Sequence, residues 1–172
     1  HDTNEDQYFK PLKLLVSLYE KWISNNKKME SDIDKEYLNA ANRNNIKCKE
    51  TLNKINNGIK FLQTNKNALK AFQLANHAIL SQQIRTKRYK DDEREWIEGI
   101  DGRVTTKTEY EEPNLLEIQT GIGNWRPFQI AFILSCIQST VQGEDIDREN
   151  VELIFFPTGG GKTEAYLGLI AF

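Results

Sequence analysis

The sequence predicts a mostly α-helical N-terminal region, about residues 1–113, followed by the start of an α/β domain, about residues 114–172. Two observations predict this division. Through much of the N-terminal region, apolar residues recur at spacings of three and four, the pattern of helices with one buried face. Near the C-terminus, a short apolar run, a glycine cluster and another apolar helical pattern follow one another, as in a strand, a loop and a helix.

The N-terminal region is expected to begin with a polar, frayed stretch and then a series of helices. The first helix is expected from Tyr8, with Pro11 in its first turn, where proline is tolerated. Residues 24–46 are rich in Asn, Lys, Asp and Glu, and they predict a loop followed by a modest helix. An apolar stripe then resumes over residues 48–62 and predicts another helix that faces the core.

The best-formed helix of this region is expected to begin at Thr64 or Asn65, since either residue suits a helix N-cap. We interpret its single histidine, His77, as an ordinary surface or core residue. From Gly99 to Pro113 the chain is polar and rich in turn residues, so the boundary between the two parts is placed there. Basic residues near the end of this helix complement its dipole, with a nucleic-acid phosphate contact as the alternative: Arg85, Lys87, Arg88 and Lys90.

Composition narrows the classes of function. The net charge of -2 and the isoelectric point near 5.8 give no global electrostatic reason to bind nucleic acid. The two cysteines, Cys48 and Cys136, lie far apart and have no metal-ligand spacing, so we expect buried thiols in a reducing compartment. The sequence contains no secretory leader and no apolar run of membrane-spanning length. We therefore expect a cytoplasmic protein that does not enter a membrane.

A phosphate-binding loop is expected between an apolar strand at residues 153–156 and a helix that follows Thr163. Glycines let backbone N–H groups approach phosphates closely, and the helix N-terminus adds partial positive charge. Lys162 would reach the β and γ phosphates, while the Thr163 hydroxyl would coordinate Mg²⁺. The sequence therefore predicts a site for ATP and Mg²⁺ with these residues: Thr158, Gly159, Gly160, Gly161, Lys162 and Thr163.

A second group of residues, Arg126 to Gln129, precedes an apolar helical pattern upstream of this loop. Phe156 stands where the general phosphate-loop pattern has glycine, but the run P-T-G-x-G-K-T resembles motif I of superfamily 2 helicases and translocases. Those enzymes place a similar upstream element, the Q-motif. A glutamine amide can both donate to and accept from the edge of adenine. We expect Arg126 to shape the turn with Pro127, Phe128 to pack beside the adenine, and Gln129 to recognise it.

Residues 124–134 and 155–169, about 26 residues together, resemble the DrmA-like superfamily 2 helicases of the bacterial DISARM anti-phage defence system. Residues 71–76 are also similar to a helix of that family. The resemblance implies that residues 114–172 open a RecA-like P-loop domain. It also implies an ATP-hydrolysing enzyme that acts on single-stranded or duplex DNA with other proteins of the defence system.

The resemblance further implies that the remaining catalytic groups are not in this sequence. An acidic pair for Mg²⁺ and the attacking water, and arginine fingers from a second RecA-like lobe, would lie beyond Phe172. We therefore expect residues 1–172 alone to hydrolyse ATP poorly. Two alternatives remain: a P-loop NTPase such as a kinase that is not a nucleic-acid motor, and a helical module whose function is to bind a protein or DNA.

Overall fold

The computed structural model describes residues 2–91, 95–107, 123–155, 157 and 159–172, except for the side chains of residues 2–6, 87–91 and 106. These residues form a mostly helical structure with one small antiparallel sheet. The expected strand at residues 153–156, the expected boundary near Pro113 and two loop positions, Phe156 and Thr158, lie partly or wholly outside the described residues.

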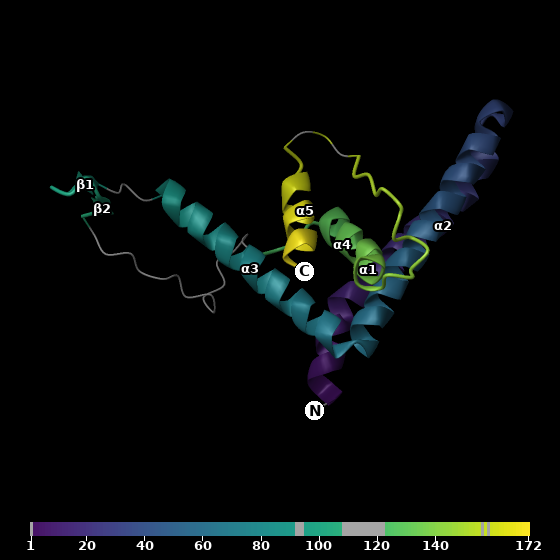
Figure 1. Cartoon of the computed structure of the whole chain (residues 1–172). Helices are drawn as coiled ribbons and strands as arrows, with labels where there is room; N and C mark the ends of the chain where they lie inside the picture. The colour runs from purple at the N-terminus through teal and green to yellow at the C-terminus, as the bar shows by residue number, and fades with distance from the viewer. Residues whose placement is uncertain (1, 92–94, 108–122, 156, 158) are drawn as a thin grey trace.

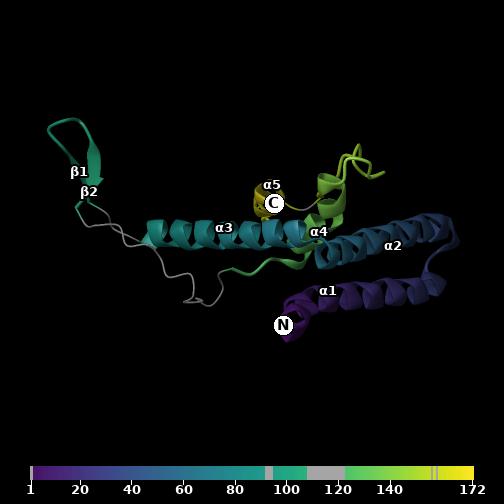
Figure 2. The same cartoon turned by 60° about the horizontal axis from the view of Figure 1, so that its bottom comes forward.

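Three long helices make up most of the N-terminal region: α1 (Asp2–Met29), α2 (Lys35–Thr64) and α3 (Lys66–Asp91). A short 3₁₀ turn, η1 (Glu30–Asp32), lets α1 and α2 run side by side in opposite directions (Figure 2). The helices α2 and α3 diverge from the turn between them, and the two shorter helices α4 (Pro127–Val141) and α5 (Lys162–Ala171) lie between their arms (Figure 1).

Several element boundaries differ from those expected. The first helix begins at Asp2 rather than Tyr8, so Pro11 lies inside it. The polar residues 24–46 are helical over most of their length, because α1 continues to Met29 and α2 begins at Lys35. A polar sequence can remain helical where the helix lies against a neighbour along one side, as α2 lies along α1. The expected cap is confirmed at Asn65, whose Oδ1 accepts the N–H of Ala68 at 3.0 Å.

The hydrophobic core joins the N-terminal helices to α4, although α4 follows the expected boundary in sequence. The buried face of α4 packs on α2 and on the start of α3, and Phe9 of α1 closes the same cluster. At the crossing of α2 and α4, a Cβ atom on Gly58 would lie 1.9 Å from the carbonyl oxygen of Leu134, so only glycine fits there. The core residues are Phe9, Ile55, Ile59, Leu62, Ala68, Phe72, Ile130, Ile133, Leu134 and Ile137.

A β-hairpin begins just before the turn-rich stretch from Gly99 to Pro113 and ends within it. Strands β1 (Trp96–Glu98) and β2 (Val104–Thr106) pair in antiparallel fashion, with Ile97 opposite Thr105. In both views the hairpin lies beyond the C-terminal end of α3, away from the other helices (Figures 1 and 2). Each strand has only three residues, which is too short for a clear alternation of apolar and polar residues.

The strand expected before the glycine loop is not formed at its described residues, Leu153 to Phe155. Leu153 is 81% exposed and Phe155 is 95% exposed. A strand is stabilised by hydrogen bonds to a neighbouring strand, and no described residue provides one here. The apolar run is therefore unpaired in this structure, and the start of a RecA-like sheet remains a proposal.

Candidate nucleotide-binding site

The glycine loop makes a tight turn into α5. The N–H of Gly160 donates to the carbonyl oxygen of Pro157 at 3.1 Å. Gly159 and Gly161 have φ angles of +80° and +86°, in the left-handed region that side chains disfavour. The expected helix after the loop, α5, starts at Lys162, two residues earlier than predicted, and no side-chain hydrogen bond from its N-cap residue, Gly161, is present. A helix N-terminus carries partial positive charge, which favours an anion.

The Arg126–Gln129 element contacts this loop directly. Nη1 of Arg126 donates to the carbonyl oxygen of Gly160 at 2.9 Å. Nε2 of Gln129 donates to the carbonyl oxygen of Gly161 at 2.7 Å, and its Oε1 accepts the N–H of Arg126 at 2.8 Å. Gln129 is only 5% exposed. The structure thus brings together the two groups of residues that the sequence singled out, through side chains on one and backbone carbonyls on the other.

Proline and glutamine have distinct local roles at the start of α4. Pro127 occupies the first turn of the helix, where its missing N–H costs nothing. The Oε1 atom of Gln129 accepts the N–H of Arg126, just before the helix, and so satisfies a donor that the helix leaves free. The same side chain therefore stabilises the helix start and reaches the glycine loop. Its amide is already engaged at both ends.

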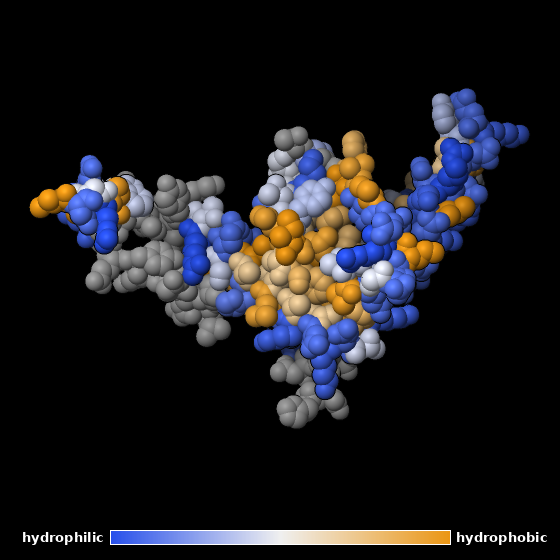
Figure 3. Space-filling model, in the orientation of Figure 1, coloured by the Kyte–Doolittle hydropathy of each residue, from blue (hydrophilic) through white to orange (hydrophobic). Residues whose placement is uncertain are grey.

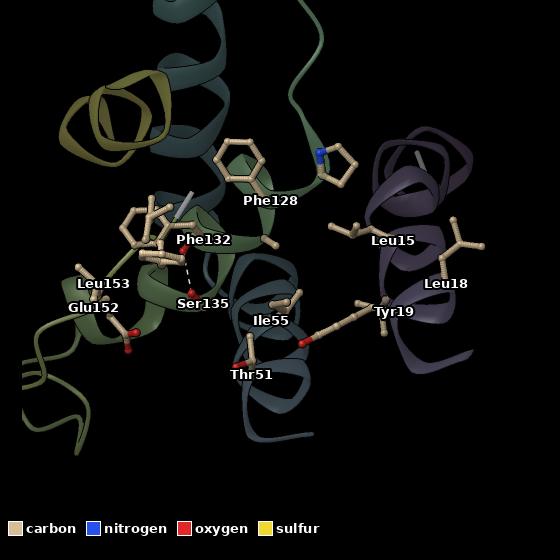
Figure 4. Close-up of a pocket in the computed structure, with 15 residues that line it drawn as sticks. Leu15, Leu18, Tyr19, Thr51, Ile55, Phe128, Phe132, Ser135, Glu152 and Leu153 are labelled. Atoms are coloured by element: carbon tan, nitrogen blue, oxygen red, sulfur yellow. Dashed lines mark hydrogen bonds between the residues drawn. The ribbon is translucent and has the colours of Figure 1, made fainter. Parts of the chain in front are cut away.

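Phe128 lines an apolar cavity of about 640 Å³ between α1, α2, α4 and residues 152–155 (Figure 4). The residues that line this cavity do not include Gln129. Joint recognition of an adenine by Phe128 and Gln129 stays a prediction. The cavity wall is formed by side chains such as Leu15, Tyr19, Ile55 and Phe132.

No protein-family model matches the chain. The chain is 37% identical over 161 residues to the DISARM protein DrmA of Bacillus paralicheniformis. This alignment takes in 92% of the chain. The chain is related to a DISARM protein. It spans 12% of the length of that relative.

The remaining predicted site residues of this DISARM-related chain lie at the start of α5. Lys162 is half-buried at the first position of the helix, and Thr163 is exposed beside it. Thr158 lies outside the described residues. Within the described part of the chain, no three His, Cys, Asp or Glu side chains gather as a metal cage. A Mg²⁺ ion held by the Thr163 hydroxyl would therefore need phosphate oxygens and water as its other ligands.

Sequence analysis missed Glu164 as part of the site. One carboxylate oxygen, Oε2, is buried and has no hydrogen-bond partner among the described residues. A Cβ atom on Gly161 would lie 3.2 Å from this oxygen and 2.7 Å from Nε2 of Gln129. The side chains of Gln129 and Glu164 therefore both lie close to Gly161 of the loop. A glutamate after Lys-Thr in a helical pattern gives no signal of this in the sequence, because its position depends on how α4 packs against α5.

An ion-pair network fixes the segment that leads from α4 to the loop. The ammonium group of Lys54, on α2, lies 3.2 Å from Asp147 and 2.7 Å from Glu152. Burial lowers the pKa of Lys54, but the hydrogen bonds and charges of Glu152 and Asp147 outweigh burial, so its pKa is raised. Farther along, Arg148 donates to the carbonyl oxygens of Ser139 and Thr140 and satisfies the end of α4.

An apolar patch lies on the face of the molecule that carries α4 and α5. Figure 3 shows apolar side chains gathered at the centre of the face that carries α4 and α5, while the far end of α2 is hydrophilic. Exposed apolar residues of α5 include Leu167 and Ile170, the latter 78% exposed. No helix in the described part of the chain has the length and apolar content needed to cross a membrane.

Proposed function

We propose that this chain carries the ATP-binding loop of a DNA-dependent ATPase, a superfamily 2 helicase or translocase that acts in DISARM anti-phage defence. Within it, Gly159 to Lys162 and the N-terminus of α5 bind the phosphates, and Thr163 supplies a ligand to Mg²⁺. Gln129 contacts the adenine in the nucleotide-bound state. DNA and other proteins of the defence system are the proposed partners of the whole protein.

One observation carries the proposal: Arg126 and Gln129 hold the carbonyl oxygens of Gly160 and Gly161. In a peptide unit the carbonyl and the N–H point in opposite directions. Fixing two successive carbonyls therefore fixes the N–H groups that follow them, including that of Lys162. Aligned N–H groups at an uncapped helix N-terminus attract a phosphate.

The relation to a DISARM protein supports the wider part of the proposal, since the alignment takes in 92% of the chain. The residues that would complete ATP hydrolysis are assigned to the remainder of a longer protein. The role of the chain within that protein is to bind and position the nucleotide. A positively charged lysine and the helix N-terminus neutralise phosphate charge, while the bound Mg²⁺ would supply the remainder of that neutralisation.

ATP hydrolysis by the full-length protein that carries this chain tests the proposal. The rate is measured alone, with single-stranded DNA and with duplex DNA, for the wild type and for Lys162→Ala. Lys66→Ala is the matched control, because Lys66 is likewise the first residue of a helix, α3, but lies outside the loop. We expect DNA-stimulated hydrolysis that Lys162→Ala abolishes and Lys66→Ala leaves unchanged.

Other outcomes lead to different functions. Lys162-dependent hydrolysis that ignores both forms of DNA would indicate an NTPase that is not a nucleic-acid motor. Wild-type turnover in Lys162→Ala would contradict the assignment of the loop. If the wild type neither bound nor hydrolysed ATP, the helical region would be the functional part, and its interactions with protein and DNA would be measured directly.

A further inference from the structure

Trp125, the residue immediately before Arg126, is attached to a helix of the N-terminal region. Its indole Nε1 donates to Oδ1 of Asn76 on α3 at 2.6 Å. Asn76 is held in turn, since its Nδ2 donates to the carbonyl oxygen of Phe72 at 2.8 Å. Asn76 therefore links α3 to the start of the candidate site.

The same tryptophan ring lies against the helix that begins at the glycine loop. A Cβ atom on Gly168 of α5 would lie 2.6 Å from Cη2 of Trp125, so α5 can approach the ring only because residue 168 is glycine. Helices α3 and α5 pack side by side, as Figure 1 shows. Trp125 thus lies between them, with its polar edge on α3 and its six-membered ring on α5.

From this position Trp125 fixes where the backbone of Arg126 and Gln129 lies relative to the glycine loop. The two residues must keep their hydrogen bonds of 2.9 Å and 2.7 Å to the loop. Displacement of the preceding residue would move both, since consecutive Cα atoms are a fixed distance apart. Gly123, two residues earlier, is also tied to α3, because its N–H donates to Oε1 of Gln83 at 3.1 Å.

We propose that Asn76 and Trp125 are positioning residues of the nucleotide site, which couple nucleotide binding at the glycine loop to the position of α3 in the helical region. The proposal rests on the nucleotide-binding role proposed above. Such coupling is reciprocal. If a ligand or partner protein that shifts α3 against α5 changes the affinity for nucleotide by some factor, the nucleotide changes the affinity for that ligand or partner by the same factor.

The test uses the full-length protein with Asn76→Ala, Trp125→Phe and the double variant. The matched control is Gln73→Ala, which alters an exposed residue on the same helix, three positions earlier. Equilibrium titration with a fluorescent ATP analogue and Mg²⁺ gives both the dissociation constant and the number of sites per protein. Loss of structure would reduce the number of sites, whereas loss of positioning raises the dissociation constant while the number of sites is unchanged.

We expect each single variant to raise the dissociation constant about five- to tenfold, the loss expected for one buried hydrogen bond. The dissociation constant of the double variant should not exceed that of the single variant with the larger loss, because the two residues act through one contact. Gln73→Ala should bind as the wild type does. Wild-type dissociation constants in both single variants, or additive losses in the double variant, would overturn the proposal while leaving the function of the loop intact.

A second measurement does not depend on nucleotide. Hydrogen exchange of the nucleotide-free protein should be faster in Asn76→Ala than in the wild type, specifically in peptides that contain Arg126 to Gln129 and Gly160 to Lys162. In Gln73→Ala it should be unchanged. Unaltered exchange at the loop in Asn76→Ala would refute positioning even if the wild type proved not to bind ATP, which separates this failure from that of the proposed function.

Discussion

Nε2 of Gln129 donates to the carbonyl oxygen of Gly161 at 2.7 Å, and this contact joins the start of α4 to the residue just before α5. The glutamine is almost fully buried, so its amide needs the partners it has. Contact with an adenine would require the side chain to use its remaining N–H or to turn. The amide of Gln129 would therefore either bind the loop and the adenine together or exchange one for the other.

Gln129→Ala should weaken binding of ATP because the glycine loop loses its contact with α4. The preference for ATP over GTP should also narrow, because the proposed adenine contact is lost. Competition titrations with both nucleotides measure the two effects. If ATP affinity falls while the preference persists, Gln129 holds only the loop, and unchanged ATP affinity would remove it from the site altogether.

Gly161→Ala should weaken nucleotide binding by more than tenfold. The residue has a φ angle of +86°, and a Cβ atom would lie 2.7 Å from Nε2 of Gln129. Gly159→Ala is the matched control, since its φ angle is +80° but no heavy atom lies within 4 Å of a Cβ atom there. Both variants carry backbone strain of about 1 kcal/mol or more, because alanine disfavours a positive φ. The difference in nucleotide affinity between them therefore isolates the collision of the new methyl group with Gln129. Equal affinities would show that the contact with Gln129 does not matter.

Gly58→Ala should lower the free energy of unfolding by about 1–3 kcal/mol, as overpacked core sites do. The new methyl group would meet the backbone oxygen of Leu134 at 1.9 Å, so α2 and α4 would have to move apart. Alanine gains about 1 kcal/mol of helix propensity, which this collision outweighs. Gly143→Ala, at a loop position with open space around its Cβ, is the control for denaturant unfolding. A stabilised Gly58→Ala variant would contradict the close crossing of the two helices.

Lys54→Met should destabilise the segment between α4 and the loop by roughly 1 kcal/mol or less, since the pair is partly exposed. Because the pKa of Lys54 is raised in the fold, its contribution is present below the ordinary pKa of lysine and is lost as pH rises through the raised value. The difference in unfolding free energy between wild type and Lys54→Met should therefore be constant across neutral pH and shrink with added salt. A difference that disappears near neutral pH would contradict the ion pair.

Much of the local structure could be predicted from sequence. The helix at Asn65 begins with the expected cap, and α5 begins at Lys162 after glycines with positive φ. Both follow from interactions between residues a few positions apart. The beginning of α1 and the length of α2 were wrongly predicted, because their polar residues hide the helical pattern that packing along one side sustains.

The strand expected at Leu153 to Phe155 shows the converse: a clear sequence pattern is present, but the element does not form. Its apolar residues favour a strand, but a strand also needs a partner, and none is present among the described residues. The same run forms one wall of the apolar cavity in Figure 4. The residue types therefore favour a strand, but the lack of a neighbouring strand among the described residues decided the conformation of the segment.

By itself, the sequence of this chain determined the helix cap at Asn65 and the position of the glycine loop, because cap and turn chemistry depends on residues a few positions apart. Only the tertiary structure decided that Gln129 holds Gly161, that Asn76 holds Trp125, and that Lys54 holds Glu152. These partners are 32, 49 and 98 residues apart. Such contacts depend on where helix packing places each side chain, and no local pattern in the sequence specifies that.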